Sequence, residues 1–267
     1  MAGAHQMLET TAKLPQGALL DVPCHGFDET LSRARAIWLR GQVAQFDLDK
    51  QSKSVIGWRA LVGDMTAVPT EPNEQNTHLA TIGDATGLQC ITAEHCGLVV
   101  PDIIEDASLF TMAIVYVPPA EGEARTLLTL NSGYSGGDSK NANYLFVSDS
   151  GGMITAKDTK GSIELNTPAT TAPGQPRLLT VSLSRDQLAV QENMGAVHLA
   201  QGAVPGFQSR ADLFIAARSH RKGLKKTLGS SAILDVMFWP RQALLLPRGP
   251  ADKAQHIALQ RYFLWAY

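Results

Sequence analysis

Short apolar segments recur about every ten residues along most of this chain, which is the spacing of strands in an all-β sandwich or barrel. From residue 79 onward these segments are separated by glycine, proline and asparagine, the residues that favour turns. Within residues 108–117, Phe110, Met112 and Ile114 alternate with residues that are themselves largely apolar. Both faces of such a strand are suited to burial, as at the centre of a sandwich. The pattern therefore predicts an all-β fold.

The two ends of the chain depart from this pattern. Residues 1–30 contain turn formers and no sustained periodicity, so we expect an N-terminal arm rather than a domain. After Pro250 the apolar residues recur at helical spacing, which predicts a short C-terminal helix that caps the sandwich. No internal repeat and no linker divides the rest, so residues 31–267 form one predicted domain.

The composition is that of a globular protein. Hydrophobic residues make up 44% and charged residues 18% of the 267 residues, a balance typical of folded domains. The net charge is -2 and the isoelectric point is near 6.4, which argues against nucleic acid as the main partner. The chain has three cysteines, and this odd number argues against a closed disulfide framework.

The N-terminal residues lack the basic start and apolar stretch of a secretory signal. No apolar run approaches the ~20 residues that span a bilayer. We therefore expect synthesis in the cytoplasm without a signal peptide, and no insertion into a membrane. If the protein acts outside the cell, it must leave by lysis or as part of a particle.

Five segments resemble, in order, the strands of concanavalin A-like, laminin-G-type domains. Residues 110–118 (FTMAIVYVP) resemble the central strand of these domains. Residues 177–183 (RLLTVSL) and 188–195 (LAVQENMG) resemble their paired strands with an Asn-x-Gly hairpin. Residues 213–218 (LFIAAR) resemble a strand near the end, and residues 231–240 (SAILDVMFWP) resemble the closing strand. The resemblance implies a two-sheet jelly roll with sites on its concave face or in the loops at one end.

Two upstream segments resemble the opening strands of such domains on phage-particle fibres and spikes. They are residues 36–39 (AIWL) and residues 56–58 (IGW). The resemblance implies a spike, fibre or decoration protein on the surface of a phage-like particle. Such a protein would be a homo-oligomer and would attach to cell-surface or capsular polysaccharide. Residues 1–30 would then be an arm that docks onto the particle or a sister subunit.

The polar loop at residues 131–144 (NSGYSGGDSKNANY) is the first candidate binding site. It combines flexible glycines with amides, a carboxylate and two tyrosines, which suit the hydroxyl groups and apolar ring faces of sugars. A calcium ion is a second possibility, because carboxylate and amide oxygens are its preferred ligands. A surface loop without a ligand is the alternative interpretation. The candidate residues are Tyr134, Asp138, Asn141, Asn143 and Tyr144.

A local excess of basic residues over 210–226 is the second candidate site. Arg218, Arg221 and Lys222 belong to this patch, and Asp212 is its one acidic residue. Such a patch suits a sulfated or uronic-acid polysaccharide, or an acidic partner subunit. A solvated hairpin is the alternative.

The aromatic residues divide into two groups. Tyr134 and Tyr144 lie in the polar loop, so we expect them to stack on a ligand rather than in the core. The tryptophans lie in apolar segments or in the predicted C-terminal helix, which favours a core role for each. They are Trp38, Trp58, Trp239 and Trp265.

The cysteines and neighbouring histidines form a possible tetrahedral zinc site. Its members would be Cys24, His25, Cys90, His95 and Cys96. The two later cysteines are separated by more than the two to four residues usual in zinc knuckles. Packing of reduced cysteines as small apolar side chains is the simpler interpretation. We therefore expect no metal site and no cofactor, with calcium left open.

The sequence lacks the motifs of hydrolases on this fold. Glycosidases need two carboxyl groups at a fixed separation, and jelly-roll glucanases supply them from an E-x-D-x-x-E strand that is absent here. No G-x-S-x-G, H-E-x-x-H or phosphate loop is present. We therefore expect a non-enzymatic carbohydrate-binding protein. The alternatives are a glycoside hydrolase or lyase on the same fold, and a purely structural oligomerisation domain.

Overall fold

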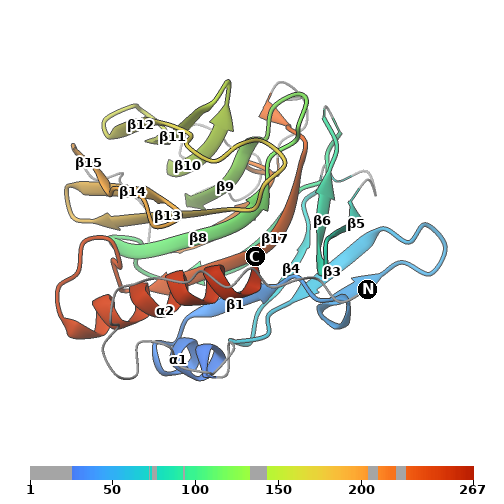
Figure 1. The fold of residues 1–267 in the computed structure, drawn as a ribbon, viewed down its shortest axis with the longest axis horizontal. Helices are drawn as coiled ribbons and strands as arrows, with labels where there is room; N and C mark the ends of the chain where they lie inside the picture. The colour runs from blue at the N-terminus through green and yellow to red at the C-terminus, as the bar shows by residue number, and fades with distance from the viewer. Residues whose placement is uncertain are drawn as a thin grey trace, which may run out of the picture.

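Two antiparallel β-sheets stacked face to face make up most of the molecule (Figure 1). The computed structural model describes residues 26–71, 73, 77–92, 94–132, 143–203, 210–220 and 227–267. An eight-stranded and a nine-stranded sheet enclose a continuous apolar core. The expected all-β, concanavalin A-like jelly-roll sandwich is confirmed.

The eight-stranded sheet contains the longest strands. Its order is β15 (His198–Gln201), β14 (Gln187–Glu192), β13 (Arg177–Ser184), β8 (Leu109–Val117), β17 (Ser231–Pro240), β6 (Ala85–Cys90) and β5 (His78–Ile82). Strand β1 (Ile37–Arg40) pairs with β17 beside this path. The central strand β8 is buried on both faces, as predicted. Phe110, Met112 and Ile114 face the other sheet, whereas Ala113 and Val115 face the helices.

The nine-stranded sheet forms the other layer of the sandwich. Its order is β12 (Glu164–Pro168), β11 (Met153–Asp158), β10 (Asn143–Ser150), β9 (Arg125–Ser132), β16 (Ala211–Ile215), β7 (Leu98–Ile104), β4 (Thr66–Pro69), β3 (Val55–Arg59) and β2 (Phe46–Leu48). A short 3-10 helix, η1 (Val43–Gln45), precedes β2. Leu128, Leu130, Leu145 and Val147 point inward to the core. Because side chains alternate along a strand, the residues between them point to the outer face.

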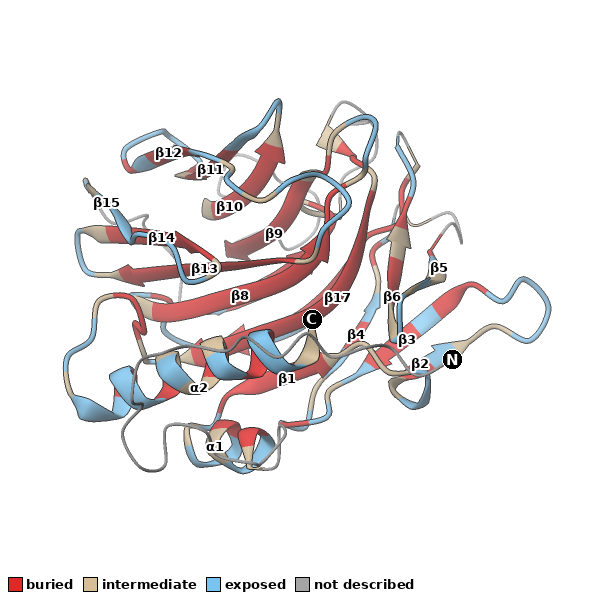
Figure 2. Ribbon diagram, viewed as in Figure 1, coloured by how far each residue is buried: buried red, intermediate tan, exposed pale blue. Residues whose placement is uncertain are grey.

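Two helices cover the outer face of the eight-stranded sheet (Figure 2). They are α1 (Phe27–Arg33) and α2 (Pro250–Ala266), and the latter confirms the predicted C-terminal helix. Phe27 stacks on Tyr262 of α2 with ring centroids 4.6 Å apart, and Trp38 packs edge-on against the same tyrosine at 5.0 Å. Helix α1 begins at Phe27, so the last residues of the expected arm, up to residue 30, are part of a helix packed on the sandwich. No helix in the described ranges is long and apolar enough to cross a membrane.

A fully buried carboxylate joins α2 to the sheet beneath it. Asp235 in β17 accepts hydrogen bonds from the Tyr262 hydroxyl at 2.5 Å, the Tyr267 hydroxyl at 2.7 Å and the Gly41 amide at 3.0 Å. Burial raises the pKa of Asp235, and these hydrogen bonds oppose the rise. The C-terminal residue is therefore held against the sandwich by a buried acid.

The core role expected for the tryptophans is right for three and wrong for one. Trp38, Trp58 and Trp239 are almost completely buried. Trp265 is 56% exposed, because it lies on the side of α2 that faces away from the sheet. Helical spacing alone did not indicate which of the terminal aromatic residues would face inward.

Candidate functional site

The outer face of the nine-stranded sheet, opposite the helices, brings two of the predicted site residues together. Tyr144 and Phe146 of β10 point outward, because Leu145 and Val147 belong to the inner core. Arg218, which follows β16, lies above them. We call this surface the Arg218 face; it comprises Thr126, Asn131, Tyr144, Phe146, Lys157 and Arg218.

The guanidinium group of Arg218 contacts two described neighbours, Phe146 and Thr126. Its central carbon lies 3.9 Å from the ring centroid of Phe146, a close cation–π contact. Its Nε donates a hydrogen bond to Thr126 Oγ1 at 3.1 Å. Burial lowers the pKa of Arg218, and the nearby Tyr144 acts in the opposite direction. Since the ring centroids of Tyr144 and Phe146 are 6.0 Å apart, two aromatic rings and one cation share this surface.

The chain after β16 folds back over the sheet and places Arg218 there. Ala216 adopts a positive φ of 55° at the turn, and the carbonyl of Arg218 accepts a hydrogen bond from Asn131 Nδ2 at 2.9 Å. The ring of His220 packs edge-on against Phe214 at 5.2 Å. A Cβ at Gly97 would lie 2.5 Å from the Cβ of Ala217, so glycine permits this close approach.

A polar ladder continues from the Arg218 face across the edge of the sheet. Lys157 Nζ lies 3.4 Å from Glu164 Oε2, and Asn166 Nδ2 donates to Glu164 Oε1 at 2.9 Å. The Thr155 hydroxyl donates to Asn166 Oδ1 at 2.6 Å. The hydrogen bond from Asn166, assisted by Lys157, lowers the pKa of Glu164 although burial opposes it. The ladder thus offers amides, a hydroxyl group and one ionised carboxylate at an exposed edge.

Among the residues that the structure describes, two polar atoms on the same side of β9 are buried without a hydrogen-bond partner. They are Thr129 Oγ1 and Asn131 Oδ1. Thr129 pairs across the sheet with Phe146 and with Phe214, and Asn131 pairs with Tyr144. Unpaired buried polar atoms are uncommon in folded proteins, and these two lie beside the aromatic residues of the Arg218 face.

The predicted site residues divide by position. Tyr144 and Arg218 meet around Phe146, which joins two candidate sites that the sequence presented as separate. Asn143 lies on β10 immediately before Tyr144, so its side chain points to the other side of the strand. Five predicted residues fall outside the described ranges. They are Tyr134, Asp138, Asn141, Arg221 and Lys222.

Sequence reasoning missed Phe146, Thr126, Asn131 and Lys157 as members of this surface. The pair Tyr144 and Phe146, two residues apart, was the available signal, since a period of two puts both rings on one face. The partners from β9 and β11 depend on strand register, which the sequence does not specify.

The proposed zinc ligands that are described occupy the core. Cys90, His95 and Cys96 are buried. The hydrogen bond with Cys96 raises the pKa of the Cys90 thiol, and burial raises it further. In the described part of the chain no group of three or more histidine, cysteine, aspartate or glutamate side chains is arranged to hold a metal ion. Cys24 and His25 lie outside it.

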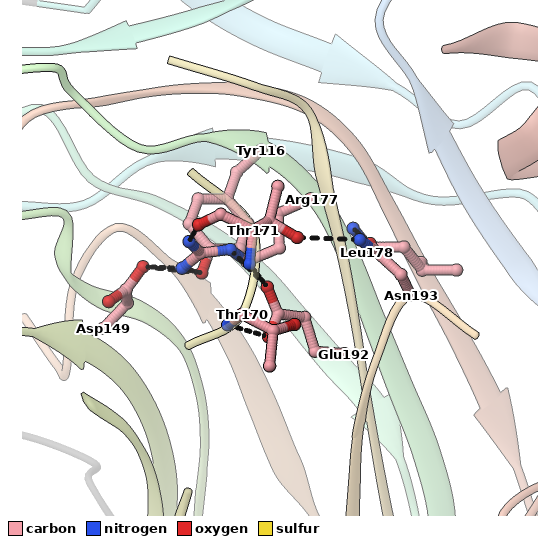
Figure 3. Close-up of polar contacts among 8 residues, drawn as sticks. All are labelled: Tyr116, Asp149, Thr170, Thr171, Arg177, Leu178, Glu192 and Asn193. Carbon is pink, nitrogen blue, oxygen red and sulfur yellow. Dashed lines mark hydrogen bonds and ion pairs between the residues drawn. The ribbon is translucent and has the colours of Figure 1, made fainter. Parts of the chain in front are cut away.

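The most concentrated group of charges is a buried cluster around Arg177 (Figure 3). Its guanidinium forms an ion pair with Asp149. The Nε atom of Arg177 lies 2.9 Å from Glu192 Oε1, and a terminal nitrogen donates a hydrogen bond to the Thr171 carbonyl at 2.5 Å. The Tyr116 hydroxyl donates to Asp149 Oδ2 at 2.8 Å. Figure 3 shows these side chains converging from β8, β10, β13 and β14.

Both carboxylates of this cluster are occupied by structural contacts. Glu192 accepts hydrogen bonds from the amides of Thr170 and Thr171 at 2.7 and 2.8 Å. Burial alone would raise the pKa of Glu192, yet these bonds outweigh it and keep the pKa below its ordinary value. Burial raises the pKa of Asp149, although Arg177 opposes the rise. The cluster secures the loop before β13 and leaves no accessible carboxylate for acid–base chemistry.

Comparison with known proteins supports the fold. No protein-family model and no curated protein matches the chain. Among solved structures, a Trypanosoma rangeli sialidase mutant displaying trans-sialidase activity has a TM-score of 0.55 at 13% identity, covering 89% of this chain and 37% of that chain. The sialidase in complex with 2,3-difluoro-KDN has a TM-score of 0.54 at 11% identity, covering 84% and 32%. Domains LG4-5 of mouse laminin alpha1 have a TM-score of 0.42 at 12% identity, covering 56% and 41%.

These comparisons correct our expectation of a non-enzymatic protein. Sialidases are enzymes, so the fold occurs within chains that cleave glycans. The missing E-x-D-x-x-E strand therefore does not exclude catalysis, because carboxyl groups also converge from separate strands. At these identities the likeness establishes the fold alone, and the chain spans about a third of the length of the sialidases.

Proposed function

We propose that this chain is a glycan-recognition domain and that the Arg218 face is its binding surface. The observation that carries the proposal is the meeting of Tyr144 and Arg218 around Phe146, from segments far apart in the sequence. An aromatic ring suits the apolar face of a sugar, and the amides and hydroxyl groups nearby suit its hydroxyl groups. The helices cover the outer face of the other sheet, so among the described residues this aromatic and basic group lies on the sheet face without helices.

A binding screen with single variants tests this proposal. Surface and capsular polysaccharides would be presented to the purified protein, with and without EDTA, and both retention and released reducing ends would be measured. We expect the wild type to bind at least one glycan, and Tyr144→Ala to bind it at least tenfold more weakly, about 1.4 kcal/mol. Arg59→Ala, at an exposed ion pair with Asp47, is the matched control and should bind as the wild type does. Equal binding by Tyr144→Ala would refute the location, and no binding to any polysaccharide would refute the function.

Cleavage of the bound glycan is the second candidate, and the likeness to sialidases favours it. Glu164 is an ionised carboxylate on the ladder beside Lys157, and a glycosidase needs one such group together with a second carboxyl. Under this candidate the wild type releases reducing ends, and Glu164→Gln releases far fewer while binding is retained. If the protein binds the glycan without EDTA and fails to bind it with EDTA, the result would instead indicate a calcium ion at the surface.

We further propose that the domain belongs to an oligomeric surface component of a phage-like particle. The support is the resemblance of residues 36–39 and 56–58 to the opening strands of fibre and spike domains. Sedimentation analysis of the full chain should then give a homo-oligomer, and antibodies to the protein should label purified particles. A monomer that is absent from particles would contradict this assignment.

A further inference from the structure

Arg218 is a partly buried cation without an anionic partner among the residues that the structure describes. Its Nε bonds to a neutral hydroxyl group, and its guanidinium plane lies on the Phe146 ring. The other deeply placed arginine, Arg177, is paired with two carboxylates. Withdrawing a guanidinium from water is unfavourable unless an opposite charge compensates for it, and the described residues supply no such charge to Arg218.

Two described carboxylates on strands of this sheet are already engaged elsewhere. Glu164 is paired with Lys157 and accepts from Asn166. Asp212, on β16, accepts a hydrogen bond from the amide of Asp102 at 2.8 Å. Neither forms an ion pair with Arg218 in the described part of the chain. The charge that compensates Arg218 is therefore not supplied by these neighbours.

The geometry of the guanidinium indicates the shape of the missing anion. Its Nε is used by Thr126, and the two terminal nitrogens have no partner among the described residues. Two parallel N–H groups match the two oxygens of a carboxylate, and a planar guanidinium bonds to it in a bidentate manner. Stacking on Phe146 fixes this plane, and Tyr144 lies beside it to contact a sugar ring.

We propose that Arg218 receives the carboxylate of an acidic sugar, so that the ligand of the Arg218 face is a carboxylated polysaccharide. This inference rests on the proposed function and names its ligand class. It makes the carboxylate, rather than negative charge in general, the recognised group. Neutral glycans and sulfate esters are thereby distinguished from the expected ligand.

The test compares each acidic polymer with its carboxyl-reduced form. Polygalacturonic acid, polysialic acid and hyaluronan would be titrated against the full-length protein, beside the same polymers after reduction of the carboxyl groups. Dextran sulfate, which carries sulfate esters and no carboxyl group, is the sulfated probe. We expect at least one acidic polymer to bind tenfold or more tightly than its reduced form and than dextran sulfate. Arg218→Gln should abolish this preference, and Arg218→Lys, which keeps the charge without the paired donors, should retain only part of it.

The possible outcomes separate this inference from the proposed function. Binding of a reduced polymer equal to that of its acid, lost in Tyr144→Ala, would keep the binding surface and overturn the carboxylate assignment. Dextran sulfate binding as tight as that of the acids would also overturn it. No binding to any polymer would overturn both proposals. Circular dichroism confirms that the variants fold, and if Arg218→Gln does not, Arg218→Lys and the wild-type preference still decide the question.

Discussion

At the scale of single residues, the two arginines that lie deepest have opposite roles. Arg177 is surrounded by carboxylates and its side chain is 3% exposed, so its contacts are complete. Arg218 has an aromatic ring and a hydroxyl group beneath it and no described carboxylate beside it. We therefore assign Arg177 to stability and Arg218 to recognition.

Replacing Arg177 with methionine should destabilise the protein strongly. The substitution leaves Asp149 and Glu192 buried without their cation, and breaking a buried pair on one side costs roughly 3–5 kcal/mol. Arg59→Met is the control, because Arg59 and Asp47 are about half exposed and such pairs contribute at most about 1 kcal/mol. Urea unfolding measures the free energy of unfolding of both variants. If this free energy falls by a similar small amount in the two variants, the Arg177 cluster does not stabilise the fold.

The buried acid Asp235 should make stability depend on pH. Its pKa is raised in the folded state, so the native protein binds more protons than the unfolded chain above about pH 3.9, the ordinary value of an aspartate. The free energy of unfolding attributable to this group therefore falls as pH rises toward the raised pKa.

The variant Asp235→Asn cannot lose a proton and removes this dependence. Relative to the wild type, it should gain stability as pH increases from about 4, where an ordinary aspartate begins to ionise. Urea unfolding of both proteins over a series of pH values measures the difference. A difference that stays constant across the series would contradict the account of this carboxyl group.

At the scale of elements, the segment 216–220 depends on the absence of a side chain at Gly97. A methyl group there would lie 2.5 Å from the Cβ of Ala217, so Gly97→Ala should displace the segment that carries Arg218. We expect a loss of roughly 1–3 kcal/mol in stability, as for other overpacked sites, together with weaker glycan binding.

Gly249→Ala is the matched control for this change. Nothing lies within 4 Å of a Cβ at that position, and the backbone is extended with φ of -170°. Gly249→Ala should lower the free energy of unfolding by less than about 1 kcal/mol, the scale of a helix N-cap change. This variant should bind the glycan as the wild type does. Wild-type binding by Gly97→Ala would show that segment 216–220 does not need its present position.

Helix α1 should contribute to the stability of the sandwich. Phe27 is 6% exposed and packs on Trp38 and Tyr262, so Phe27→Ala should cost about 3 kcal/mol in thermal or urea unfolding. Val43→Ala, at a side chain that is 63% exposed, should have almost no effect. An unchanged midpoint for Phe27→Ala would mean that α1 is not docked in solution.

The strands that sequence analysis identified are those with β-branched and aromatic side chains. Strands β8, β13 and β17 were predicted within a residue or two, because each contains several apolar residues in close succession. Strands β5 and β6 were not singled out, because Ala80, Gly87 and Gln89 have low strand propensity. A Cβ at Gly87 would lie 2.3 Å from the Ile233 carbonyl, so packing rather than propensity selects that residue.

The candidate site was predictable only in part, because its residues come together through strand order and a turn. Tyr144 and Arg218 were identified from residue type, since each lies in a polar or basic segment. Their convergence on Phe146 follows from the order β10–β9–β16 and from the turn at Ala216. Neither strand order nor the direction of a segment after a strand is specified by local pattern.

At the scale of the whole molecule, the two outer faces of the sandwich differ. Helices α1 and α2 cover the eight-stranded sheet with apolar contacts, as Figure 2 shows by the buried inner sides of both helices. The nine-stranded sheet presents the Arg218 face and the polar ladder of β11 and β12. This asymmetry is the basis for placing the ligand on one face of the molecule.

Chemical-shift mapping of backbone amides tests that placement most directly. The labelled full-length protein would be titrated with the tightest polysaccharide fragment from the binding screen. We predict that the largest shifts occur at Thr129 and Asn131 of β9, at Tyr144 and Phe146 of β10 and in segment 216–220, with α1 and α2 unchanged. Shifts confined to the helices, or none at a saturating concentration of a fragment that binds, would contradict glycan recognition by the Arg218 face.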